Sequence, residues 1–84
     1  MSDILKTIKE NVFVVISKKD CYYCILVKEL LKRKNVYYTE IIYNDEMFVD
    51  ISFLKNKWNI KSYPMVFLKN KYIGSYRELI NYPL

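Results

Sequence analysis

Residues 12–34 read VFVVISKKDCYYCILVKELLKRK, and within them a strand pattern passes into a helical pattern through two closely spaced cysteines. Val12–Ile16 is a continuous run of β-branched and aromatic residues, which predicts a strand buried on both faces of a sheet. Polar residues interrupt the run at positions 17–20. From Tyr22 to Lys34 the apolar residues recur at helical spacing, so we expect a helix that begins directly after the first cysteine.

The other segments predict a mixed four-stranded sheet flanked by helices, an α/β fold in a single domain spanning residues 1–84. A strand–helix–strand order implies a parallel pair, whereas the tight turn at Lys69-Asn70 implies an antiparallel pair. The remaining expected elements are a helix through Lys9 capped by Ser2 or Asp3, a strand over 36–43, a helix of about twelve residues capped by Asn44 or Asp45, strands over 65–68 and 71–73, and a helix over 76–81.

The composition excludes several kinds of site. The chain has a net charge of +5, no histidine, one glycine and two cysteines. Without histidine there is no Ser–His–Asp or Cys–His catalysis, and one glycine is too few for a glycine-rich phosphate loop. Two cysteines cannot form a four-cysteine zinc site within one chain. No apolar run approaches the ~20 residues of a membrane span, and no stretch resembles a signal peptide, so we expect a cytoplasmic protein.

Cys21-Tyr22-Tyr23-Cys24 is a CxxC motif at the expected junction of strand and helix. Two inert core cysteines are the alternative interpretation, but this motif beside a strand–helix–strand pattern is typical of thioredoxin-like redox proteins. Cys21 would lie at the first turn of the helix, where free N–H groups, the helix dipole and the nearby Lys18 favour a thiolate. We therefore predict Cys21 as the nucleophile and Cys24, one helical turn further on, as the resolving thiol.

The chain resembles the glutaredoxins from Val12 to Leu79, because several short segments occur in the same order as in that family. The segments are Val14-Val15-Ile16-Ser17-Lys18, Cys21-Tyr22-Tyr23-Cys24, Lys28-Glu29-Leu30-Leu31, Ser62-Tyr63-Pro64-Met65-Val66-Phe67 and Tyr72-Ile73-Gly74. The resemblance implies a thioredoxin-like fold and a glutathione-dependent thiol–disulfide oxidoreductase. Glutathione is the implied co-substrate, and no metal is expected.

The resemblance also implies a groove for glutathione beside Cys21. Lys18 and Lys61 would attract the carboxylates of glutathione, and the backbone of Tyr63 would pair with its cysteinyl part. The N–H groups at the start of the last helix would hold its γ-glutamyl end. The implied substrate-binding residues are Lys18, Tyr23, Lys61, Tyr63, Pro64 as a cis-proline, Gly74, Ser75, Arg77 and Glu78.

Other functions remain open. Ser75 and Arg77 depart from the family pattern, which leaves room for a thioredoxin-like electron donor served by a reductase. Tyr22 stands where the family usually has proline, and this departure favours a dimer that holds an iron–sulfur cluster through two Cys21 sulfurs and two glutathiones. A basic nucleic-acid-binding module is less well supported, because the lysines are spread over all elements. We expect a monomer whose partners are glutathione and disulfide-bonded or glutathionylated proteins, and neither nucleic acid nor membrane.

Overall fold

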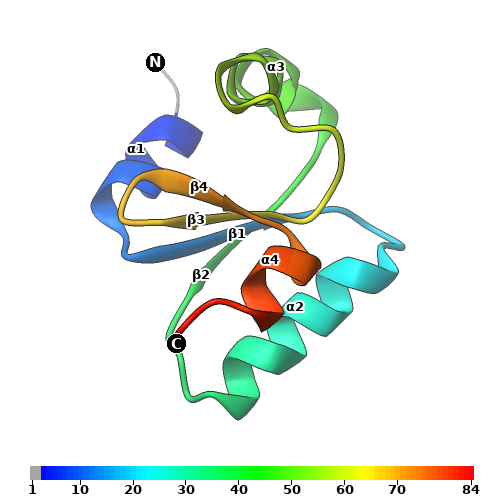
Figure 1. The fold of residues 1–84 in the computed structure, drawn as a ribbon. Helices are drawn as coiled ribbons and strands as arrows, with labels where there is room; N and C mark the ends of the chain where they lie inside the picture. Colours follow the sequence, from blue (N-terminus) through cyan, green and yellow to red (C-terminus); the bar gives the residue numbers. More distant parts are fainter. Residues whose placement is uncertain (1–2) are drawn as a thin grey trace.

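The computed structural model describes residues 3–84 and contains five helical segments and four strands in that range. They follow the predicted order of helices and strands along the chain (Figure 1). The elements are α1 (Asp3–Glu10), β1 (Phe13–Ser17), α2 (Tyr22–Arg33), β2 (Thr39–Ile42), the 3₁₀ turn η1 (Asp45–Met47), α3 (Phe48–Trp58), β3 (Met65–Leu68), β4 (Lys71–Gly74) and α4 (Tyr76–Ile80).

The strands form one mixed sheet in the order β2-β1-β3-β4, which confirms the predicted architecture. β1 pairs with β2 in parallel and with β3 in antiparallel orientation, and β3 pairs with β4 in antiparallel orientation. β1 therefore has a neighbour on each side, and all five of its residues are buried. This central position explains why its sequence is apolar without alternation.

Helices cover both faces of the sheet and create two separate cores. α1 and α3 lie on one face, and α2 and α4 lie on the other (Figure 1). Successive strand residues point to opposite faces, so Val14 and Ile16 join the first core while Phe13 and Val15 join the second. The CxxC segment connects the central strand to a helix on the second face.

The second strand is shorter than expected, because it covers Thr39–Ile42 rather than 36–43. Its ladder with β1 joins Val14 to Thr39 at one end and Ser17 to Ile42 at the other, and Phe13 of β1 has no partner in β2. Val36 and Tyr38 precede the strand and pack against the core that α2 covers. These two residues are typical of strands, but here they pack against the core without joining the sheet.

Helix ends also differ in detail from the expected ones. Asn44 caps η1 by accepting a hydrogen bond from the Glu46 N–H at 2.9 Å, and α3 follows that turn as a separate helix. α1 begins at Asp3, so Asp3 lies in its first turn, while the alternative cap Ser2 lies outside the described residues. α2 ends at Arg33 with Lys34 as its C-cap, and Asn35 follows with a left-handed φ of 57°, a conformation common just after a helix.

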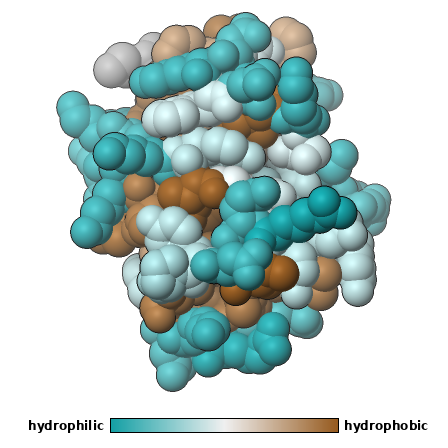
Figure 2. Space-filling model, viewed as in Figure 1, coloured by the Kyte–Doolittle hydropathy of each residue, from teal (hydrophilic) through white to brown (hydrophobic). Residues whose placement is uncertain are grey.

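No helix among residues 3–84 is long and apolar enough to cross a membrane. On the face shown in Figure 2, hydrophobic residues form separate small patches between hydrophilic ones. The large apolar side chains exposed on that face therefore do not merge into one broad surface.

Candidate active site

The two cysteines lie at the first turn of α2, as the sequence predicts. Cys21 is the N-cap residue, with an extended backbone, and its sulfur accepts a hydrogen bond from the Cys24 N–H at 3.2 Å. A sulfur thus takes the position in which serine, threonine or aspartate usually satisfies a free N–H. Cys21 is partly exposed, whereas Cys24 is only 1% exposed.

Cys21 and Cys24 are joined by a disulfide, with their Cα atoms 5.2 Å apart. That separation lies within the usual range for disulfides, so the backbone of the motif accommodates the oxidised state. After reduction, the same N–H and the dipole of α2 favour negative charge on the Cys21 sulfur. The difference in exposure leaves Cys21 as the sulfur that a substrate can approach.

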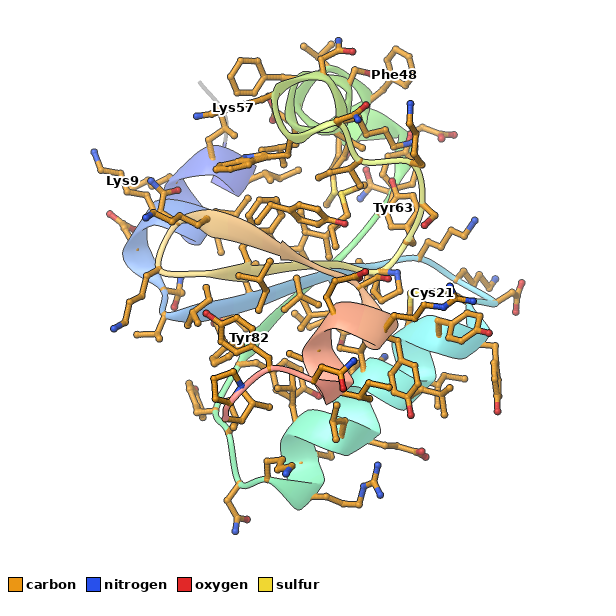
Figure 3. All side chains as sticks on the ribbon, viewed as in Figure 1. Lys9, Cys21, Phe48, Lys57, Tyr63 and Tyr82 are labelled. Atoms are coloured by element: carbon orange, nitrogen blue, oxygen red, sulfur yellow. A yellow bond between two sulfur atoms is a disulfide. The ribbon has the colours of Figure 1, made fainter. Side chains whose placement is uncertain are left out.

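Tyr63 lies in the loop between α3 and β3, on the same side of the molecule as Cys21 (Figure 3). The Tyr63–Pro64 peptide bond is cis, as the resemblance implies, and Pro64 is fully buried. The Tyr63 ring lies 5.9 Å from the Tyr43 ring. Partial burial raises the pKa of the Tyr63 hydroxyl, with a further contribution from Tyr43, so the ring stays neutral.

Gly74 and Glu78 pack tightly at the start of α4. Gly74 has a φ of +126°, and a Cβ on it would lie 2.5 Å from the Glu78 Cβ, so a side chain has neither the conformation nor the room that it needs. The Glu78 carboxylate accepts hydrogen bonds from the Ser75 N–H at 2.8 Å and the Ser75 hydroxyl at 3.3 Å. The Ser75 N–H bond is the main reason that the pKa of Glu78 is lowered. In this structure Glu78 caps α4.

A pocket of about 270 Å³ joins the Tyr63 loop to the start of α4. Across it the Tyr23 and Tyr76 rings lie 6.0 Å apart. Four of the predicted binding residues line it, together with two that the prediction missed, Ser62 and Tyr76. The lining residues are Tyr23, Ser62, Tyr63, Ser75, Tyr76 and Arg77. Ser62 and Tyr76 are sequence neighbours of predicted binding residues. Including the neighbours of each predicted residue would therefore have identified both.

The other predicted binding residues lie outside this lining. Pro64 and Gly74 are buried, and Lys61 is exposed in the loop before Tyr63. Lys18 is also exposed, and its Nζ lies 5.4 Å from the centre of the Tyr63 ring. Lys55, which the sequence did not single out, reaches the same ring from α3 at 5.3 Å. Lys55 and Tyr63 are well separated in the sequence, so no local sequence pattern indicated that their side chains would meet.

A partly exposed polar contact joins three elements near the CxxC motif. Ser17, at the end of β1, donates a hydrogen bond to the Glu40 carboxylate at 2.7 Å, and the Lys28 ammonium contacts the same oxygen at 2.8 Å. Burial by itself raises the pKa of Glu40. The hydrogen bonds from Lys28 and Ser17, together with the positive charge of Lys28, lower that pKa by more, so it lies below its usual value. The contact connects β1, β2 and α2, the helix that carries the CxxC motif.

The sequence profile described as Glutaredoxin matches residues 13–73. The chain belongs to the glutaredoxin family. It is 31% identical over 72 residues to glutaredoxin 1 of Rickettsia typhi, which covers 84% of this chain and 69% of that protein. It is also 31% identical over 72 residues to glutaredoxin 1 of Rickettsia prowazekii, with 84% and 76% covered.

Solved glutaredoxin structures have the same fold. The buckwheat glutaredoxin–glutathione complex superposes with a TM-score of 0.84 at 25% identity and covers 92% of this chain and 72% of that one. Holo glutaredoxin C1 from Populus tremula x tremuloides gives 0.82 at 26% identity, covering 90% and 70%. With its CxxC motif at the start of α2, this glutaredoxin is a thiol–disulfide oxidoreductase.

Proposed function

We propose that this glutaredoxin uses glutathione to reduce glutathione mixed disulfides and protein disulfides. The observation that carries the proposal is the pocket between the Tyr63 loop and α4, whose Tyr23 wall belongs to the CxxC motif. A tripeptide bound there would have its sulfur close to the start of α2. The structural similarity to a buckwheat glutaredoxin–glutathione complex supports the same ligand.

Reduction of a glutathione mixed disulfide needs only Cys21. The Cys21 thiolate attacks the glutathione sulfur, the client sulfur leaves as a thiolate and takes up a proton, and glutathione remains bound to Cys21 through a disulfide. A second glutathione thiolate then attacks the bound glutathione sulfur. This step releases the Cys21 thiolate and glutathione disulfide, so one free glutathione is consumed for each mixed disulfide and the other half of the glutathione disulfide comes from the substrate.

Reduction of a protein disulfide uses both cysteines. Cys21 attacks one client sulfur, and Cys24 then attacks Cys21, which releases the client dithiol and leaves the Cys21–Cys24 disulfide. The structure contains this disulfide. Two glutathione molecules would reduce it again and become glutathione disulfide.

The charges around the pocket suit an anionic tripeptide. Arg77 lines the pocket, Lys61 is exposed in the loop before Tyr63, and Lys18 is exposed with its Nζ 5.4 Å from the centre of the Tyr63 ring. Such cations raise the local concentration of an anion and favour the thiolate form of an attacking sulfur.

The direct test compares electron donors. The purified protein would be assayed with a small glutathione mixed disulfide, using either glutathione with glutathione reductase or thioredoxin reductase without glutathione. We expect turnover that saturates with glutathione. Turnover that depends on thioredoxin reductase and ignores glutathione would instead support the reductase-served electron donor.

A further inference from the structure

We propose that two copies of this chain associate through the outer side of α3, with the two helices packed antiparallel. The sequence predicts a monomer, whereas the side chains that the fold leaves exposed on α3 indicate a weak homodimer. The interface does not involve the CxxC motif, so its test is independent of the proposed function.

Three large apolar side chains of α3 are exposed. Phe48 is 64% exposed, Val49 76% and Phe53 50%. Val49 and Phe53 are four residues apart and therefore neighbours on one side of the helix, and Phe48 adjoins them. Ile51 and Leu54 point toward the sheet and are buried. Among residues 3–84 no other element covers the outer side of α3, and Phe48 points away from the sheet (Figures 1 and 3).

The size of this patch suits a weak interface. An aromatic side chain offers about 150–250 Å² in full, so the three partly exposed side chains present roughly 300 Å² of apolar surface per copy. Contiguous apolar patches of this size on a small protein are often interaction sites. Burying the patches of two copies, with the polar residues around them, gives an interface at the small end of the range for specific complexes, which is typical of reversible association.

The charges along α3 make this side complementary to a second copy of itself. Asp45 and Glu46 are exposed directly before α3, and Lys57 is exposed in its last turn. If Val49 of one copy stacks on Phe53 of the other in an antiparallel arrangement, residues 45 and 46 of each copy lie opposite residues 57 and 56 of the other. Two-fold symmetry then repeats every acid–lysine contact. A parallel arrangement would instead place like charges together.

Lys57 is positioned at the edge of the apolar patch. Its ammonium group lies 6.0 Å from the centre of the Phe53 ring and 5.5 Å from that of Trp58, within the range of cation–π contacts. Within residues 3–84 neither Lys57 nor Glu46 takes part in an ion pair. The net charge of +5 opposes association of two copies, and the acidic residues before α3 offset this repulsion locally.

The proposed interface leaves the redox site open. α3 covers one face of the sheet, whereas α2, which begins after Cys21, covers the other (Figure 1). Both Cys21 sulfurs therefore stay accessible in the dimer. A cluster-bridged dimer is different in kind, because it is held by the Cys21 sulfurs and by iron.

The experiment measures sedimentation velocity of the full chain at a series of concentrations from about 10 µM to 1 mM. The buffer contains a reductant and an iron chelator, which prevent dimers held by disulfides or by a cluster. Val49→Lys tests the apolar patch. Val12→Lys is its matched control, because Val12 is also a largely exposed valine, 60% exposed, but precedes β1 and lies outside α3.

The charge contacts are tested by reversal. Glu46→Lys and Lys57→Glu would be measured separately, as an equimolar mixture and combined in one chain. Each single variant places like charges opposite each other in its own homodimer. The mixture and the double variant place opposite charges together again, so they separate an antiparallel contact from a change within one chain.

We expect wild type to dimerise with a dissociation constant of roughly 0.1 mM, as for a small interface. Val49→Lys should raise this constant at least about tenfold, and Val12→Lys should leave it unchanged. Each single charge variant should weaken association about two- to tenfold, and the mixture and the double variant should recover it. A wild type that stays monomeric at 1 mM, equal losses from the two valine variants, or no recovery on charge exchange would overturn the inference.

Discussion

The backbone N–H of Cys24 donates a hydrogen bond to the sulfur of Cys21 at 3.2 Å. The second cysteine thus contributes two different groups, a thiol that resolves an intermediate and a main-chain donor that favours charge on the first sulfur. The donor belongs to the backbone, so it remains when the Cys24 side chain is changed. The two functions of residue 24 are therefore separable by mutation.

Cys24→Ser should keep most activity on glutathione mixed disulfides and lose most reduction of protein disulfides. Cys21→Ser should abolish both activities, since a serine hydroxyl is not an effective nucleophile without a base and the chain contains no histidine. Both activities would be measured for both variants. Iodoacetamide labelling of the reduced wild type at mildly acidic pH should modify Cys21 first. Equal losses in the two variants, or faster labelling of Cys24, would show that the roles are assigned wrongly.

Lys18→Glu and Lys61→Glu should each raise the apparent KM for glutathione by about two- to fivefold at low salt, with a smaller effect at high salt. The reason is the loss of a cation expected to attract an anionic tripeptide. Lys69→Glu is the control, because Lys69 follows β3 and thus lies at the opposite end of that strand from Tyr63. A charge reversal at position 18 or 61 that matches this control at low salt would remove that residue from the site.

Gly74→Ala should lower the free energy of unfolding by about 1–3 kcal/mol, in line with the cost of a strained backbone conformation. The φ of +126° disfavours any residue with a side chain, and the added Cβ would lie 2.5 Å from the Glu78 Cβ. Chemical denaturation measures the change. Since α4 must shift to make room, glutathione turnover should fall as well. A variant with wild-type stability would show that α4 adjusts freely.

Glu40→Gln should lower the free energy of unfolding by about 0.5–1 kcal/mol at pH 7, because the Lys28 ion pair is partly exposed. The pKa of Glu40 is lower in the folded protein than in the unfolded chain. Its stabilising contribution is therefore present above the unfolded pKa and is lost as pH falls through the folded pKa. The difference between variant and wild type should shrink on acidification.

Glu29→Gln is the control for this pH dependence, since Glu29 is an exposed glutamate of α2 whose carboxylate makes no hydrogen bond or ion pair among the contacts of residues 3–84. Unfolding curves at a series of pH values from 7 to below 4 would be compared for the two variants and wild type. A difference at Glu40 that stays constant across this series would contradict the role assigned to its carboxylate.

Local sequence patterns alone predicted the strand and the helix that flank the CxxC motif. The apolar run before residue 17 predicted the buried central strand, and helical spacing after Cys21 predicted α2. Met65–Leu68 was predicted with the bounds that the structure has. The proximity of the two sulfurs also follows from the sequence alone, because residues three apart at the start of a helix lie within one turn of each other.

Tertiary structure alone decided the surroundings of these elements. The length of β2 depends on its ladder with β1, and the contact between Ser17 and Glu40 joins residues 23 positions apart. Lys18 and Lys55 meet at Tyr63 only because the loop after β1, the end of α3 and the loop before β3 come together at one end of the paired central strands. Spacing along a helix or strand determines near neighbours, whereas strand order and helix packing determine which distant side chains share a site.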